Sequence, residues 1–166
     1  NICLKKASRY VTNYKKGEST MSKRIIEDVY VVSAKRTPVA KGKRGSFAKV
    51  RPDDLMTHAM KGALEGVDID PNCIDDVIVG CAMPEAEQGL NVARLCALMA
   101  GLPQSVSGMT INRYCSSGMQ SIAIAADRIA LGACDAMIAG GTESMSMIPM
   151  GGHNISANKN SSNSPF

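Results

Sequence analysis

The chain has 166 residues, the length of one domain, and its 45% apolar and 20% charged residues are typical of a soluble globular protein. The net charge of +4 arises at the start of the chain: residues 1–24 contain seven basic residues and one acidic residue, whereas the rest contains 12 basic and 14 acidic residues. This near-neutral remainder and an aromatic content of 4% argue against a nucleic-acid-binding surface.

The basic start of the chain lacks the apolar core of a secretory signal, and no run of about 20 apolar residues predicts a membrane helix. We expect a cytoplasmic protein, or a mitochondrial or peroxisomal one if the source is eukaryotic. Residues 1–20 have three interpretations: a leader upstream of an initiating Met21, a transit peptide, or an ordered arm. The first is preferred, so residues 1–24 are predicted to be a disordered or non-native leader.

The following residues alternate between strand-like and helical patterns. The predicted order is a strand at 29–33, a helix with Asp53 as its N-cap, a strand at 77–81, a helix at 92–100, a strand at 106–112, a helix at 116–131 and a strand that ends at Gly140 and Gly141. This order forms βαβ units, which predicts an α/β fold with parallel strands and helices on the faces of the sheet. We expect one domain over residues 25–150, followed by a Gly/Asn/Ser-rich, truncated tail over 151–166.

The predicted helix at 116–131 is apolar on nearly all sides, with a narrow polar edge at Gln120, Asp127 and Arg128. Such a helix belongs between two layers that both exclude water. About 130 folded residues are too few to supply both layers. We therefore expect that this chain is only part of a larger fold.

Cys115 stands where the strand-like run ends and this apolar helix begins. The partial positive charge at a helix N-terminus favours the thiolate, so this position predicts a lowered pKa. Position alone leaves two roles open for Cys115, a nucleophile or a small buried apolar residue. The other five cysteines lie in ordinary positions, and the absence of a CxxC pair argues against a zinc site, so no metal is expected.

Four segments resemble the N-terminal half of the thiolases, which are acyl-CoA:acetyl-CoA acyltransferases. They are "SAKRTPVAKGKRGSF…RPDDL", "VIVGCAMPEAEQGLNVAR", "NRYCSSGMQS" and "AGGTESMSMIPMGGH", and the resemblance runs from about Val29 to His153. It implies a thiolase-like half with a mixed, mostly parallel sheet and helices on both faces, incomplete without the second half. The run "CSSGMQ" resembles the degradative 3-ketoacyl-CoA branch; the biosynthetic acetoacetyl-CoA branch is the alternative.

The resemblance implies that Cys115 attacks a 3-ketoacyl-CoA and carries the acyl group as a thioester, which free CoA then collects. It also implies that the backbone N–H of Cys115 donates to the oxyanion. Gly118 fits a helix pressed against neighbouring backbone, and Gly140 and Gly141 fit a tight exit from the last strand. Coenzyme A enters as a substrate, no cofactor is implied, and the full-length relatives form homodimers or homotetramers.

Other catalytic groups of the family come from the second half, so neither His58 nor His153 is assigned a role. The basic run from Lys35 to Arg51 is interpreted as a solvated loop in preference to a CoA-phosphate patch. Three functions are compared: the nucleophile-bearing part of a thiolase, a condensing ketoacyl synthase, and a non-catalytic fragment. The thiolase part alone is expected to be inactive. The "GGTESMSM" run disfavours the second, and no membrane or nucleic-acid partner is expected.

Overall fold

The computed structural model describes residues 2–7 and 26–154, and all structural statements concern these residues. They form five strands, three α-helices and two short 3-10 helices. The strands are β1 (Ile2–Ala7), β2 (Asp28–Ala34), β3 (Asp76–Gly80), β4 (Ser107–Ile111) and β5 (Ala136–Gly141). The helices are α1 (Pro52–Glu65), α2 (Val92–Met99), α3 (Ser117–Ala130), η1 (Pro71–Cys73) and η2 (Ala86–Gln88).

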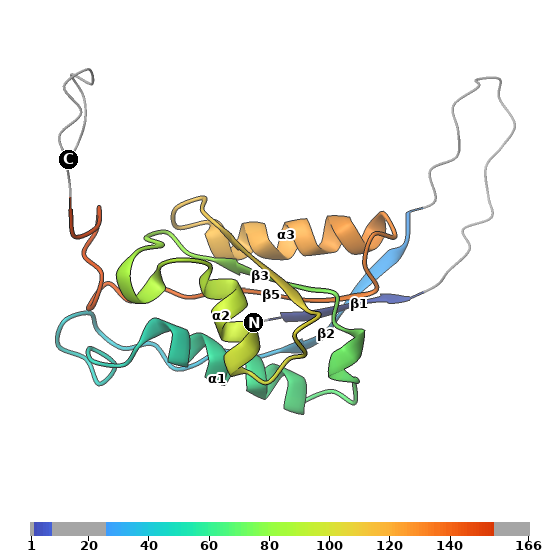
Figure 1. Ribbon diagram of the computed structural model, residues 1–166, viewed down its shortest axis with the longest axis horizontal. Coiled ribbons are helices and arrows are strands. Elements are labelled where there is room, and N and C mark those ends of the chain that lie inside the picture. The colour runs from blue at the N-terminus through green and yellow to red at the C-terminus, as the bar shows by residue number, and fades with distance from the viewer. Residues whose placement is uncertain (1, 8–25, 155–166) are drawn as a thin grey trace, which may run out of the picture.

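The five strands form one mixed sheet in the order β2-β1-β5-β3-β4 (Figure 1). β3 pairs in parallel with both β4 and β5, whereas β1 is antiparallel to its two neighbours, β2 and β5. The strands and α-helices from β2 onward confirm the elements and the α/β class predicted from the periodicity, whereas η1 and η2 were not predicted. The parallel strands place the ends of β3, β4 and β5 at one edge of the sheet, where the loops after them meet.

Residues 1–24 were predicted to be a disordered or non-native leader, and for Ile2 to Ala7 the structure contradicts the predicted disorder. Ile2 to Ala7 form a strand inside the sheet, with Cys3 fully buried and Leu4 2% exposed. The sequence Ile-Cys-Leu alternates between the two faces of the sheet, a pattern too short to stand out in a basic segment. Residues 8–24 of the predicted leader and 155–166 of the predicted tail lie outside the described residues.

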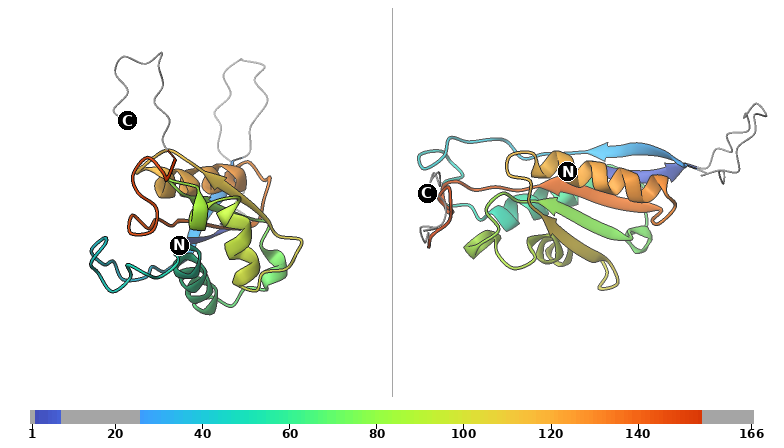
Figure 2. Two further views of the ribbon diagram at one scale, coloured as in Figure 1. Left: turned by 60° about the vertical axis from the view of Figure 1, so that its left-hand side comes forward. Right: turned by 90° about the horizontal axis from the view of Figure 1, so that it is seen from above.

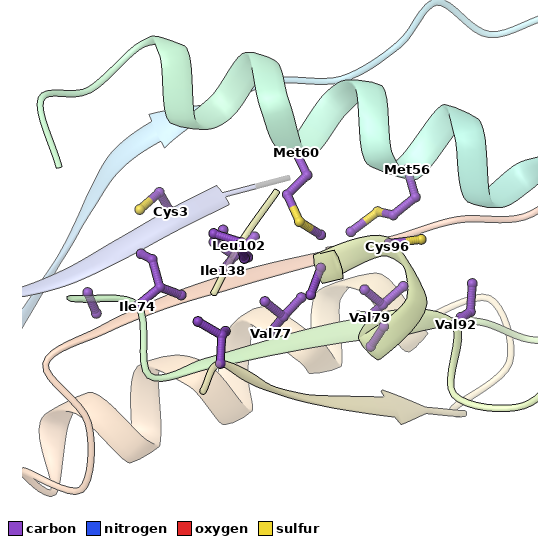
Figure 3. Close-up of a cluster of buried hydrophobic side chains, with 14 of the residues drawn as sticks. Cys3, Met56, Met60, Ile74, Val77, Val79, Val92, Cys96, Leu102 and Ile138 are labelled. Atoms are coloured by element: carbon purple, nitrogen blue, oxygen red, sulfur yellow. The ribbon is translucent and has the colours of Figure 1, made fainter. Parts of the chain in front are cut away.

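The helices cover both faces of the sheet, as expected, with α1 and α2 on one face and α3 on the other (Figures 1 and 2). The larger core lies under α1 and α2, where Met56 and Met60 pack with Cys96 and the strand residues Val77 and Val79 (Figure 3). A second core, which includes Leu4, Ile78, Ala125, Ile129 and Met137, lies under α3. β1 contributes to both cores, because Cys3 belongs to the first and Leu4 to the second.

Two details of the helices differ from the predictions. α1 begins two residues earlier than expected, since Arg51 is its N-cap and Pro52 its first residue. Asp53 instead pairs with the Arg51 guanidinium at 2.8 Å. α3 buries one stripe, with Ser117, Ser121, Ala125 and Ile129 against the sheet, whereas Met119 is 77% exposed. Within the described residues α3 is therefore covered on one side only.

The first turn of α3 lies directly against the backbone of β3. A Cβ atom placed on Gly80 would lie 2.2 Å from the carbonyl carbon of Ser117 and 2.4 Å from the amide nitrogen of Gly118. A Cβ on Gly141 would lie 3.1 Å from the Gly80 carbonyl oxygen, whereas one on Gly118 would make only ordinary contact with Gly141 at 3.8 Å. The close approach predicted for Gly118 is thus present, but Gly80 is the residue that makes it possible.

The first test of this packing is Gly80→Ala, which forces the start of α3 away from the sheet. We expect the free energy of unfolding to fall by about 3 kcal/mol, at the upper end of the usual cost of overpacking, because both contacting groups are backbone. Gly42→Ala is the matched control, since nothing lies within 4 Å of a Cβ there. Urea denaturation followed by circular dichroism measures both variants, and equal stability of the two would contradict the contact.

Candidate active site

A cavity of about 400 Å³ opens at the edge of the sheet where β3 and β5 end, and Cys115 lies in its wall. Tyr114, Ser117 and Gly118 line it beside Cys115, from the turn into α3. Its other walls come from the last residues of β3 and β5 and from the segments that follow these strands: Gly80, Ala82, Met83, Gly141, Thr142, Glu143, Met145 and Met150. The position matches the general preference of α/β folds for binding at the carboxyl ends of parallel strands.

A hydrogen-bonded turn places Cys115 immediately before the N-terminus of α3. The Asn112 carboxamide oxygen accepts from the Tyr114 N–H at 2.8 Å, while its amide nitrogen donates to the Ala82 carbonyl oxygen at 2.9 Å. The Ser117 hydroxyl donates to the Tyr114 carbonyl oxygen at 2.6 Å and accepts from the Arg113 N–H at 2.8 Å. The turn is therefore tied both to the helix and to the loop after β3.

Tyr114 has a φ of +49°, in the left-handed region that bulky residues rarely adopt. Such strain persists only where surrounding contacts enforce it, and it occurs often at functional sites. Here the hydrogen bonds of Asn112 and Ser117 enforce it. The result is a sharp bend immediately before Cys115, which lies one residue ahead of the N-cap Ser116.

The thiol of Cys115 is exposed, unlike those of four of the other cysteines. All six cysteines are free; Cys73 is the second exposed one, and Cys3, Cys81, Cys96 and Cys134 are buried. Burial, reinforced by the Glu143 carboxylate, raises the pKa of Cys81 to about 12. Burial likewise raises the pKa of Cys96 to about 11. These two side chains stay protonated and shielded at neutral pH, so they cannot serve as nucleophiles.

A buried glutamine holds two walls of the cavity together. The Gln88 side chain is fully buried, donates to the Met83 carbonyl oxygen at 2.8 Å and to the Glu143 carboxylate at 2.6 Å, and accepts from the Ser144 N–H. The other Glu143 carboxylate oxygen accepts from the Ala82 N–H at 2.7 Å. Gln88 and Glu143 were not predicted from the sequence, since a single polar residue in a short 3-10 helix or in a loop carries no periodic signal.

The remaining sequence candidates lie apart from Cys115. His58 and His153 are exposed and do not line this cavity. Gly140 does not line it either, and its carbonyl oxygen accepts from the buried Ser121 hydroxyl at 2.8 Å. Part of the basic segment, Arg36 to Gly42, lines a neighbouring cavity of about 380 Å³. The two cavities share Gly141, Thr142, Glu143 and Met145. The segment thus approaches the site, although most of its charged side chains are exposed as expected.

Residues 2–7 and 26–154 contain no group of three or more His, Cys, Asp or Glu side chains that could hold a metal ion. In the same part of the chain, no helix has the length and apolar character needed to cross a membrane.

Comparison with known proteins identifies what this arrangement resembles. The family model described as "Thiolase, N-terminal domain" matches residues 29–164. The chain is 56% identical over 128 residues to the 3-ketoacyl-CoA thiolase of Bacillus subtilis, and 43% identical over 126 residues to that of Aliivibrio salmonicida. These matches cover 77% and 75% of this chain but 33% of each relative, so the chain spans about a third of their length.

A solved structure, the Bacillus anthracis acetyl-CoA acetyltransferase, superimposes with a TM-score of 0.70 at 36% identity. The match covers 75% of this chain and 31% of that one.

The Gln88 network predicts a stability effect. Gln88→Leu keeps the volume of the side chain but leaves the Ser144 N–H and the Met83 carbonyl without their partner, so we expect the free energy of unfolding to fall by about 2 kcal/mol. Gln104→Leu is the matched control, since Gln104 is exposed. Thermal unfolding of both variants gives the comparison, and a smaller loss for Gln88→Leu than for Gln104→Leu would be inconsistent with the network.

The burial pattern also predicts which thiols react. At pH 7.5 in the native state, iodoacetamide should label Cys115 and Cys73 well before Cys81 and Cys96, because the last two are buried with raised pKa values. Peptide mapping by mass spectrometry gives the order of labelling. Labelling in urea is the control, in which all six cysteines should react alike; early native labelling of Cys81 would show that the loop after β3 does not cover it.

Proposed function

This chain belongs to the thiolase family, and from that premise we propose that it is the nucleophile-bearing part of a 3-ketoacyl-CoA thiolase, with Cys115 as the nucleophile. The observation that carries the proposal is an exposed thiol in the wall of a 400 Å³ cavity, at the start of a helix that rests on the sheet. The named relatives with 56% and 43% identity support the 3-ketoacyl-CoA branch.

In the proposed reaction, the Cys115 thiolate forms a bond to the keto carbon of a 3-ketoacyl-CoA. The bond between this carbon and the adjacent α-carbon then breaks, and its electron pair leaves with acetyl-CoA as an enolate that takes up a proton. The acyl group stays on sulfur as a thioester. The thiol of a second CoA loses its proton and attacks this thioester, which releases a shortened acyl-CoA and the free cysteine.

The local geometry supports the placement of developing negative charge near the turn. Cys115 lies beside the N-terminus of the 14-residue helix α3, where backbone N–H groups and the helix dipole favour an anion. The proposal includes the backbone N–H of Cys115 as one donor to the oxyanion. Coenzyme A acts as a substrate in this scheme, and no further cofactor takes part.

The preferred hypothesis is that the reaction runs in the degradative direction, the cleavage of 3-ketoacyl-CoA in fatty acid β-oxidation. The alternative is an acetoacetyl-CoA thiolase, favoured by the solved acetyl-CoA acetyltransferase with a TM-score of 0.70. A non-catalytic role is the third candidate, since the chain spans a third of its relatives. We further propose that the whole protein assembles as a homodimer or homotetramer, in which the exposed apolar residues of α3, such as Met119, become covered.

The test is acyl transfer to the thiol. On incubation with acetoacetyl-CoA, a protein that carries this sequence together with the remaining two thirds of a thiolase should show an acetyl adduct on the peptide that contains Cys115 and should release acetyl-CoA when CoA is added. Cys115→Ser should reduce turnover by about a thousandfold or more, because a hydroxyl is a far weaker nucleophile than a thiolate near neutral pH.

Cys73→Ser is the matched control, since it removes the other exposed thiol, and it should leave turnover unchanged. An adduct on Cys73, or substantial turnover by Cys115→Ser, would refute the assignment. The present 166-residue chain alone should show no complete thiolysis; turnover by this chain would show that the rest of a thiolase is not needed.

A further inference from the structure

The backbone of Ala82 is held by side chains from two other segments of the chain. The N–H of Ala82 donates to the Glu143 carboxylate at 2.7 Å, and its carbonyl oxygen accepts from the Asn112 side-chain amide at 2.9 Å. Ala82 follows β3, Asn112 follows β4 and Glu143 follows β5. These two hydrogen bonds therefore join the segments that follow all three parallel strands, at the edge of the sheet where the cavity beside Cys115 opens.

Asn112 uses both ends of its side-chain amide. The nitrogen donates to the Ala82 carbonyl oxygen, and the oxygen accepts from the N–H of Tyr114 at 2.8 Å. An ionised aspartate at this position would offer acceptors only, and an apolar side chain would offer neither a donor nor an acceptor. The amide thus ties the backbone two residues along the chain to a segment 30 residues away.

The backbone of Tyr114 is held from both sides. Its N–H is fixed by Asn112, and its carbonyl oxygen accepts from the Ser117 hydroxyl at 2.6 Å. These two contacts hold the φ of Tyr114 at +49°, a value that a bulky residue keeps only when its surroundings enforce it. The carbonyl of Tyr114 shares one peptide plane with the N–H of Cys115. Rotation of this plane would therefore move both the N–H and the thiol of Cys115.

Asn112 acts on the bend and not on the hydrophobic cores. Its side chain is exposed, and it belongs to neither core, so its removal leaves the packing of the sheet against the helices intact. Ala82, which Asn112 anchors, lines the cavity together with Cys115. Loss of the amide should therefore give a folded protein in which the bend and one wall of the cavity are no longer tied together.

We propose that Asn112 is a positioning residue for Cys115 and that it acts through the backbone of Tyr114. Ala82 and Glu143 form the anchor against which it holds the bend. The proposal rests on the proposed function, because the role exists only if Cys115 is the nucleophile. Since Asn112 fixes where the thiol and the N–H of Cys115 lie, it affects the rate of the bond-forming steps more than the binding of the CoA substrates.

The test measures kcat and KM for the cleavage of acetoacetyl-CoA by a protein that carries this sequence together with the remaining two thirds of a thiolase. Asn112→Ala should lower kcat by about thirtyfold and change KM by less than about twofold, because a misplaced nucleophile slows the chemical steps and not binding. Asn72→Ala is the matched control and should leave both constants unchanged. Asn72 is also exposed and donates from its side-chain nitrogen to the Asp70 carboxylate at 2.8 Å, but it does not line the cavity.

A second substitution separates positioning from a contribution to folding. Glycine adopts a positive φ readily, so Tyr114→Gly removes the need for a side chain that enforces the bend. When Tyr114→Gly is present, Asn112→Ala should lower kcat by no more than about threefold, compared with about thirtyfold when it is absent. If Asn112 only stabilised the fold, its loss would cost at least as much in the double variant, because glycine also destabilises through the unfolded state.

The unsubstituted protein distinguishes failure of this proposal from failure of the proposed function. The absence of an acetyl adduct on Cys115 in that protein would refute the proposed function and the positioning role with it. Equal turnover by the unsubstituted protein and by Asn112→Ala would overturn the positioning role alone, as would an equal loss of kcat with and without Tyr114→Gly. Failure of Asn112→Ala to fold, measured by circular dichroism, would also overturn it, because the role would then be structural.

Discussion

The structure of the candidate site depends on one backbone-to-backbone contact, the approach of the first turn of α3 to Gly80. Because no side chain fits between them, the end of β3 and the start of α3 form a single rigid junction. The bend at Tyr114 and the thiol of Cys115 are fixed relative to this junction, and the loops after β3 and β5 meet beside it. A surface loop alone would not hold a thiol in a defined place against a cavity wall.

Periodicity was sufficient to predict the strands and α-helices from β2 to β5. β3 is buried along its whole length and each α-helix buries one face, whereas β2 is mostly exposed. It also placed Cys115 correctly at the junction of strand-like and helical patterns. The N-cap of α1 was misplaced, since Asp53 is a good capping residue in general but here pairs with Arg51, while Pro52 occupies the first turn. β1 escaped prediction because its three apolar residues are followed by two lysines, and one of its two partners, β5, lies far away in the sequence.

The walls of the cavity were the least predictable part. Met83, Glu143 and Met145 lie in irregular loops, whose paths are set by hydrogen bonds to Gln88 and not by any repeat of apolar residues. The sequence does not distinguish a buried glutamine whose side-chain atoms are all hydrogen-bonded from a glutamine exposed to solvent. The family resemblance singled out Cys115 as the proposed nucleophile, whereas the residues that shape its surroundings could not be predicted from the sequence.

The pairing of Ile2 with Ala139 also has a consequence for the order of folding. These partners lie almost at opposite ends of the described chain, so the middle of the sheet closes only after nearly all of it has been synthesised. Until then β1 has only β2 to pair with, and a two-stranded ribbon is marginally stable in water. The nascent chain therefore presents an open edge of β1 until β5 has been synthesised.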